Sequence, residues 1–262
     1  MRVDRRFTLG LLAAAPVGLA AGTTGAARIR DAVRLSVGIP LPRFALLRPG
    51  SRSYLISSIK DGRHTAESIW RREVRFELDG DEPRLRIIQH WDGVGAAPTV
   101  SERESLFEMS TFRPSLHTRI TTKDGQRTVE GFLFGEHAIT GLPGLKDNIR
   151  ADFRVASAEP MYNFETDIEM LQSLPWTRGY AVSIPFFHPA PGSVPARYLW
   201  SVETEDAVPG PDGRRIDCWV VACDYNKGRA PTRFWLAKRT QQLVKMEGPG
   251  VDGAIRRKSL LF

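Results

Sequence analysis

Histidine and carboxylate side chains are the groups in this sequence that could carry acid–base or metal chemistry. The five histidines are His64, His90, His117, His137 and His188, and none stands at metal-ligand spacing from another. A catalytic site assembled only by the fold would gather two or more of the last four with a carboxylate in one cleft. The carboxylates Glu165, Asp167 and Glu169 cluster in one short segment, where the dipole of an expected helix explains them.

Sequence motifs of known reactions are absent. The chain has no Gly-x-Ser-x-Gly elbow, no His-Glu-x-x-His helix, no phosphate-binding glycine loop and no dinucleotide fingerprint. We therefore assign no catalytic residues, no metal ligands and no cofactor. This favours a binding protein and leaves an enzyme as an alternative.

Two cysteines, Cys218 and Cys223, lie in the run DCWVVACDYN. Five residues apart on one strand, their side chains point to opposite faces of a sheet. Their Cα atoms would be roughly 16 Å apart, which is beyond the reach of a disulfide. We interpret both as small buried apolar groups; a disulfide would need a bend or bulge between them.

The first 27 residues have the three-part layout of an export signal: arginines, an apolar run from Leu9 to Ala21, and small residues. The apolar run is too short to span a bilayer, so we expect no transmembrane anchor after processing. Cleavage near residue 26 or 27 would release a mature chain into the periplasm. Arg5-Arg6 leaves both the general secretory and the twin-arginine route open.

The charge of the chain argues against a nucleic-acid partner. The formal net charge is +7, and part of that excess belongs to the export signal. The remaining basic residues are spread out, the longest block being Arg256-Arg257-Lys258. Nucleic-acid binding needs a clustered basic face, so we exclude it.

Short β-like runs fill the mature chain, residues 28–262, which we take as a single β-rich domain. Six Asp-Gly pairs occur along the chain, and this dipeptide is typical of tight hairpin turns. Val74, Phe76 and Leu78 alternate with charged residues, as in a half-buried strand. Near the C-terminus we expect Phe234 and Leu236 on one face of a hairpin strand, with Trp235 on the other.

One segment departs from the β pattern. Asn163–Pro175 carries Phe164, Ile168, Leu171 and Leu174 at helical spacing. Thr166 and Glu169 fit a capping box, and Pro175 would end the helix. The expected fold is mainly β: a curved antiparallel half-barrel of about ten to twelve strands, with this amphipathic helix as a lid or plug.

Aromatic residues are dense in and beside the expected elements, above all from Leu174 to Pro189. They could form a core capped by the helix, or the apolar lining of a ligand cavity. On the second interpretation the ligand-binding candidates are Trp176, Tyr180, Phe186, Trp200, Trp219 and Trp235.

The C-terminal half resembles a family of exported bacterial proteins of uncharacterised function. The resemblance rests on Leu174-Pro175, Gly179-Tyr180, Asp217 to Val221, Phe234 to Glu247 and Asp252-Gly253. It implies a fold like that of the periplasmic lipoprotein carriers, an incomplete antiparallel barrel around an apolar cavity with a helical lid. The family carries over no catalytic residues.

Three functions follow from these observations. The first is a periplasmic protein that binds or carries a hydrophobic ligand, a lipid or an acyl chain, in its half-barrel. The second is an envelope scaffold or assembly factor that binds a protein partner through an exposed apolar patch or an open sheet edge. The third is an enzyme whose site only the fold assembles.

Overall fold

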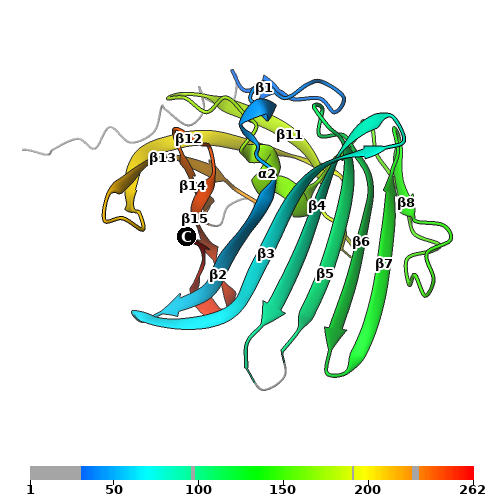
Figure 1. Ribbon diagram of the computed structural model, residues 1–262, viewed down its shortest axis with the longest axis horizontal. Helices are drawn as coiled ribbons and strands as arrows, with labels where there is room; N and C mark the ends of the chain where they lie inside the picture. Colours follow the sequence, from blue (N-terminus) through cyan, green and yellow to red (C-terminus); the bar gives the residue numbers. More distant parts are fainter. Residues whose placement is uncertain (1–30, 96–97, 191, 226–229) are drawn as a thin grey trace, which may run out of the picture.

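A computed structural model describes residues 31–262 except 96–97, 191 and 226–229. The expected export signal, residues 1–27, lies outside the described residues. Most of the described chain belongs to one strongly curved β-sheet (Figure 1). The sheet is antiparallel except where the two-residue strands β1 and β10 pair in parallel with β11.

The order of the strands in the sheet follows their order in the chain, from β11 to β16, then β2 to β9, with β1 outside β11. The ends of this order, β1 and β9, do not pair, so the sheet is not closed. The strands are β1 (Val33–Arg34), β2 (Gly50–Lys60), β3 (Arg63–Asp79), β4 (Glu82–Gly93), β5 (Val100–Glu108), β6 (Pro114–Lys123), β7 (Gln126–Phe134), β8 (Ala138–Gly141), β9 (Arg154–Ala156), β10 (Tyr162–Asn163), β11 (Ala181–Phe187), β12 (Ala196–Pro209), β13 (Arg215–Cys223), β14 (Thr232–Ala237), β15 (Leu243–Pro249) and β16 (Ile255–Leu261).

The expected fold class is confirmed: the protein is a mainly β, open barrel with one short helix. The predicted number of strands was too low. The described residues form sixteen strands instead of ten to twelve. Four of the sixteen, β1, β8, β9 and β10, are two to four residues long. Runs that short have no detectable alternation, so the sequence pattern does not reveal them.

Asp-Gly pairs make several of the expected turns. At Asp61-Gly62 and Asp124-Gly125 both residues have positive φ, as a two-residue hairpin turn requires, and they join β2 to β3 and β6 to β7. Asp92-Gly93 instead lies at the end of β4. A Cβ atom at Gly93 would come within 2.7 Å of the carbonyl oxygen of Thr99, so this glycine permits a close approach of two backbones.

The two faces of the C-terminal strands pack differently. Phe234 and Leu236 of β14 join the main core inside the curve, whereas Trp235 packs in a second cluster on the other face, as the alternation predicted. Cys218 lies in the second cluster and Cys223 in the main core. Both cysteines are buried and free, which confirms their interpretation as small apolar groups.

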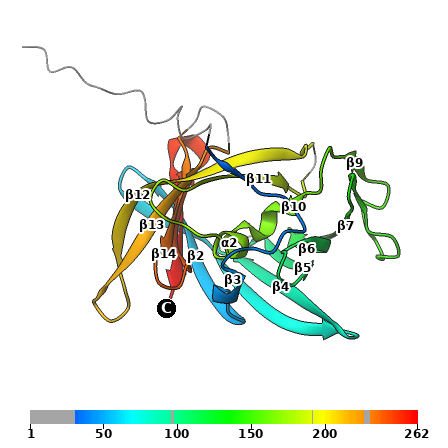
Figure 2. The ribbon, with the colours of Figure 1, turned by 90° about the horizontal axis from the view of Figure 1, so that it is seen from above.

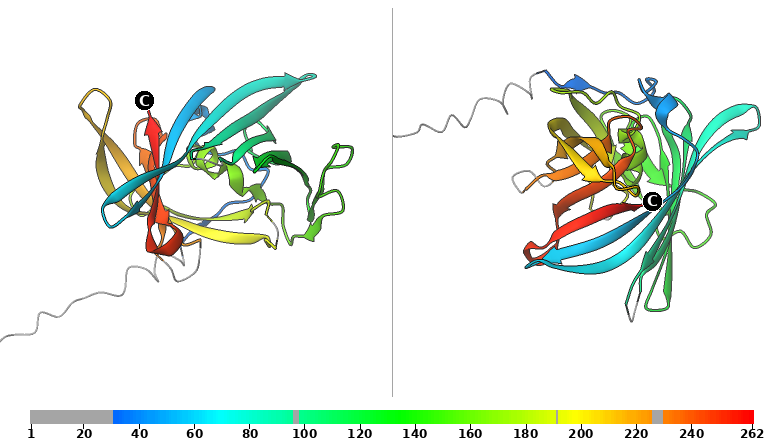
Figure 3. Two further views of the ribbon diagram at one scale, coloured as in Figure 1. Left: turned by 90° about the horizontal axis from the view of Figure 1, so that it is seen from below. Right: turned by 60° about the vertical axis from the view of Figure 1, so that its left-hand side comes forward.

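The expected helix is shorter than its sequence pattern. A 3-10 turn, η2 (Phe164–Thr166), leads into α2 (Asp167–Leu171), inside the curve of the sheet (Figures 2 and 3). The predicted capping box of Thr166 and Glu169 is wrong. The side chain of Asn163 accepts a hydrogen bond from Glu165 N, and the Thr166 hydroxyl donates to the carbonyl of Asn163. The segment is a plug, because its apolar side chains lie in the main core.

The other helical elements are single 3-10 turns, η1 (Phe44–Leu46) and η3 (Val251–Gly253). In the described part of the chain, no helix has the length and apolar character needed to cross a membrane.

Packing of the plug should contribute strongly to stability. Leu171→Ala, at a side chain with 0% exposure, should lower the free energy of unfolding by about 2–5 kcal/mol, because it leaves a cavity in the core. Leu78→Ala, at a side chain with 72% exposure, is the matched control and should cost less than about 0.5 kcal/mol. Urea denaturation measures both. Equal effects would show that α2 is not packed as described.

Candidate functional site

A row of polar side chains crosses the concave wall of the sheet from β3 to β7. Its members are successive cross-strand partners: Arg72 pairs with Gln89, Gln89 with Arg103, Arg103 with Arg119, and Arg119 with Glu130. Direct cross-strand partners share one face of a sheet, so all five side chains point toward α2. Arg72, Gln89 and Glu130 are buried.

Neighbouring rows on the same face differ in character. The row on one side, two residues further along each strand, begins with the partners Val74 and Ile87. Both are buried in the main core. The row on the other side begins with the partners Trp70 and Trp91. The polar row therefore lies between the apolar core and these two tryptophans.

Arg72 binds the helix through its whole guanidinium group. Its Nε and Nη2 atoms donate to the two carboxylate oxygens of Glu169 at 2.7 and 2.6 Å, a bidentate pair. Nη1 donates to Gln89 Oε1 at 2.6 Å, and Nη2 also reaches the carbonyl oxygen of Glu165 at 3.0 Å. With 2% of its surface exposed, Arg72 needs such partners, because an unpaired buried charge is strongly unfavourable.

Glu165 of η2 anchors the other half of the row. Its carboxylate accepts a hydrogen bond from Arg119 Nη1 at 2.8 Å and forms an ion pair with Arg103. Its carbonyl oxygen also accepts from Gln89 Nε2 at 3.0 Å. Burial alone would raise the pKa of Glu165, but the charges of Arg103 and Arg119 hold it below its usual value. The carboxylate is therefore ionised and fully engaged.

His117 of β6 lies beneath this anchor. Its Nδ1 is 2.8 Å from the hydroxyl of Ser105, and its Nε2 is 3.6 Å from a carboxylate oxygen of Glu165. Asn163 donates to the same serine at 3.2 Å. Burial lowers the pKa of His117 to about 4, so the imidazole is neutral near pH 7.

A cavity of about 400 Å³ opens beside the plug, between the polar row and strands β15 and β16. Its lining combines aromatic and apolar side chains with five cations and two carboxylates. The residues are Trp70, Arg72, Trp91, Arg103, Arg119, Phe164, Glu165, Asp167, His188, Tyr225, Thr232, Met246, Gly248, Pro249, Arg256 and Lys258.

Two stacked tryptophans form one wall of the cavity. The ring centroids of Trp70 and Trp91 are 3.5 Å apart and the rings are nearly parallel, at 9°. The guanidinium carbon of Arg103 lies 3.2 Å from the centroid of Trp91, and Lys258 Nζ lies 4.1 Å from that of Trp70. Since the stack leaves no room between the rings, the two cations lie on its outer faces and hold it by cation–π attraction.

Asp167 lines the cavity at the start of α2. Burial raises its pKa, although Lys258 and Arg72 oppose that shift. The hydroxyl of Tyr225 donates a hydrogen bond to its Oδ2 at 3.2 Å. This carboxylate is thus less firmly held in its charged form than Glu165.

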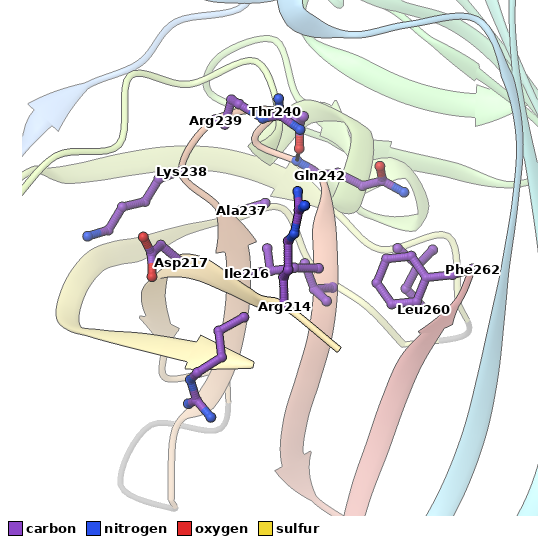
Figure 4. Close-up of a pocket in the computed structure, with 12 residues that line it drawn as sticks. Arg214, Ile216, Asp217, Ala237, Lys238, Arg239, Thr240, Gln242, Leu260 and Phe262 are labelled. Carbon is purple, nitrogen blue, oxygen red and sulfur yellow. Dashed lines mark hydrogen bonds between the residues drawn. The ribbon is translucent and has the colours of Figure 1, made fainter. Parts of the chain in front are cut away.

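A larger pocket, of about 540 Å³, lies where β14 turns into β15, away from the plug. Figure 4 shows Leu260 and Phe262 on one side and Lys238, Arg239 and Thr240 on another. Lys238 is already paired with Glu205 at 2.6 Å. We favour the smaller cavity as the functional site, because it gathers buried charges and aromatic rings that a hydrophobic core does not need for its stability.

The six residues predicted from sequence as ligand contacts do not line the smaller cavity. Phe186 and Trp200 are fully buried together in the main core, with ring centroids 6.5 Å apart. Trp176 is also fully buried, and packs edge-on against Tyr180. Their role in ligand contact stays a prediction.

The remaining two candidates lie on β13 and β14. Trp219 has the Lys238 ammonium 4.4 Å from its ring centroid. Trp235 packs in the second cluster, and its indole N–H donates to Asp206 at 2.8 Å. Trp219 packs against the main core, whereas Trp235 lies on the other face of the sheet.

The histidines only partly meet the pattern expected of an enzyme. His117 and His188 both lie near Glu165, whose charge affects the pKa of each. Glu165 is bound by two arginines, so it is a poor proton acceptor. In the described ranges, no group of three or more histidine, cysteine or carboxylate side chains is placed to hold a metal ion.

Sequence reasoning missed the polar row and the Trp70–Trp91 pair. The alternation that marked Val74 as buried also places Arg72 and Trp70 on the same face, and this was the available clue. The carboxylates Glu165 and Glu169 were explained by the helix dipole. They instead form ion pairs with the sheet.

Together these features define an open antiparallel β-barrel with a charged, helix-plugged interior. The chain belongs to a family of proteins of unknown function, DUF3108, which matches residues 53–251. The crystal structure of a beta-barrel-like protein of domain of unknown function DUF1849 from Brucella abortus is similar, with a TM-score of 0.48 and 10% sequence identity over 82% of this chain and 96% of that one. No curated protein matches the chain.

The family match confirms membership of an uncharacterised family. The barrel-like fold rests on the curved, open sheet itself. The resemblance to lipoprotein carriers and the expected export stay predictions.

Loss of the Arg72–Glu169 pair should destabilise the protein severely. Glu169→Gln leaves a buried guanidinium without its counter-charge and should cost about 3–5 kcal/mol in urea denaturation. Asp92→Asn makes the same chemical change in the exposed pair with Arg71, the residue preceding Arg72. That control should cost less than about 1 kcal/mol. Similar losses would rule out a special role for the buried pair.

Neutral His117 should make stability depend on pH. Because its folded-state pKa is lowered from 6.5 to about 4, the unfolded chain binds a proton in this interval that the folded chain excludes. Stability is then fully present above pH 6.5 and declines as the pH falls toward 4, by on the order of 3 kcal/mol. His117→Asn, which keeps an acceptor for Ser105, should flatten the profile of unfolding free energy between pH 6.5 and 4.5.

The exposed His64 provides the control for this experiment. His64→Asn should leave the pH profile unchanged. A flat profile in the unsubstituted protein would contradict the neutral, buried state of His117.

Proposed function

We propose that this protein binds a hydrophobic ligand, a lipid or an acyl chain, in the cavity beside α2, after export to the periplasm. The observation that carries the proposal is the aromatic wall of that cavity. Trp70 and Trp91 are stacked beside an opening of about 400 Å³ and do not fill it. A space of that size is in the range of small-molecule sites.

The rest of the lining supports an apolar body in the ligand. Phe164 of η2 and Met246 and Pro249 of β15 line the cavity from two different elements. Methionine side chains adapt to ligands of varied shape, and aromatic rings provide large apolar contact areas. The polar row anchors the plug and keeps the cavity wall in place without occupying the cavity, because its charges are paired with one another.

A carrier role in the periplasm is consistent with the N-terminal sequence, whose layout is typical of an export signal. A lipid moving across the aqueous periplasm needs a protected apolar compartment. An open barrel with an internal plug can provide one.

The first test is native mass spectrometry of the protein purified from the cell envelope, followed by extraction of bound molecules. We expect a stoichiometric lipid or fatty acyl mass. Protein that carries nothing, and that stays free of ligand when lipids are offered, would overturn the proposal. A protein that co-purifies in its place would favour the envelope scaffold.

Two tryptophan variants test where the ligand binds. Trp91→Leu removes half of the aromatic stack and should weaken lipid binding about tenfold, because both contact area and ring stacking are lost. Trp219→Leu, outside the cavity, should bind within about twofold of the unsubstituted protein. Titration with a fluorescent fatty acid measures both. A larger loss at Trp219 would move the site to the aromatic residues predicted from sequence.

A further inference from the structure

Lys258 of β16 is a buried cation that faces the cavity. Only 5% of its surface is exposed, and it lines the cavity opposite the polar row. Its ammonium lies over the ring of Trp70, at 4.1 Å from the centroid. On the strand it stands between Met246 of β15 and Ile56 of β2, so the sheet fixes its direction.

Lys258 differs from the other four cations of the cavity in having no carboxylate partner. Arg72, Arg103 and Arg119 bind Glu169 or Glu165, and Arg256 binds Glu67 at 3.1 Å. Across the described ranges, Lys258 makes no hydrogen bond and no ion pair, and its contact is the ring of Trp70. It is therefore the one cavity cation, among the described residues, with its hydrogen-bonding capacity unused.

The charged groups around Lys258 do not neutralise it. Arg72 and Arg256 disfavour its charge, while Asp167 and Glu169 favour it from beyond ion-pair distance. Burial and these two arginines lower the pKa of Lys258 to about 7. An ammonium in such a place gains much from an incoming anion, since a charge-assisted hydrogen bond is strong where water is excluded.

We propose that Lys258 binds the anionic head group of the cavity ligand, so that the preferred ligand is an acyl chain ending in a carboxylate or a phosphate. The inference rests on the proposed function and names the chemistry of its ligand. The head group would accept hydrogen bonds from the ammonium, with Arg256 next to it on the cavity lining. The acyl chain would lie along Trp70, Trp91 and Met246.

Ligands that share one chain length and differ in the head group test this inference. Dodecanoate, dodecyl phosphate, dodecanol and dodecylamine are titrated into the full-length mature protein, freed of bound lipid, by isothermal titration calorimetry at pH 7. We expect one or both anions to bind about 10- to 100-fold more tightly than the alcohol, the range of a hydrogen bond to a charged group. The amine should bind most weakly, because like charges repel.

Two lysine variants provide the matched pair. Lys258→Met keeps the length and the apolar stem, so it should remove the preference for the anion while leaving dodecanol binding within about twofold. Lys245→Met is the control, because Lys245 also lies over a tryptophan, Trp235, at 3.6 Å, but on the other face of the sheet. It should leave all four affinities unchanged. Lys258→Arg should retain a preference for anions.

The outcomes separate the two proposals. If dodecanol binds as tightly as both anions, or if Lys258→Met keeps the preference, the head-group inference fails while the hydrophobic-ligand function stands. If none of the four compounds binds, the proposed function itself fails. Tighter binding of dodecanoate than of dodecyl phosphate identifies a carboxylate head group, and the reverse identifies a phosphate head group.

Discussion

The burial of arginine on the concave wall is the constraint on which the interior depends. Three largely buried guanidinium groups, of Arg72, Arg103 and Arg119, project from β3, β5 and β6. Burial of such charges is tolerated only with good geometry and full pairing. Glu165 and Glu169 provide that pairing, and both come from one short segment. The segment from η2 to α2 must therefore lie against this wall, in one register, whatever its intrinsic helical preference.

This pairing also explains how an eight-residue plug of mixed helical type can be well defined. A helix of five residues has almost no stability alone. Apolar side chains such as Leu171 hold it to the core on one side, while the carboxylates bind the sheet on the other. With the plug fixed near β3 to β6, the space toward β15 and β16 is not filled. The cavity is thus a consequence of where the ion pairs place the plug.

The sequence predicted the elements better than their contacts. Alternation found the long strands and the two faces of Phe234, Trp235 and Leu236, because both are local properties with a period of two. The site was missed because it joins Arg72 to Glu169, 97 residues apart, and no local pattern records such a pair. The aromatic candidates, such as Trp176 and Trp200, were selected by density, which marks the centre of a core as readily as a binding surface.

Arginine and lysine have different roles in this interior, and their chemistry explains the difference. A guanidinium keeps its charge and binds a carboxylate with two parallel hydrogen bonds, so it suits a permanent pair such as Arg72 with Glu169. A lysine ammonium is a point charge that loses its proton more easily when it is buried. At Lys258, where burial lowers the pKa to about 7, the side chain can release its proton near neutral pH while the cavity is empty, and an anion would favour the charged form. An arginine at this position would leave a permanent unpaired charge whenever the cavity is empty, so a lysine fits a site that alternates between empty and occupied.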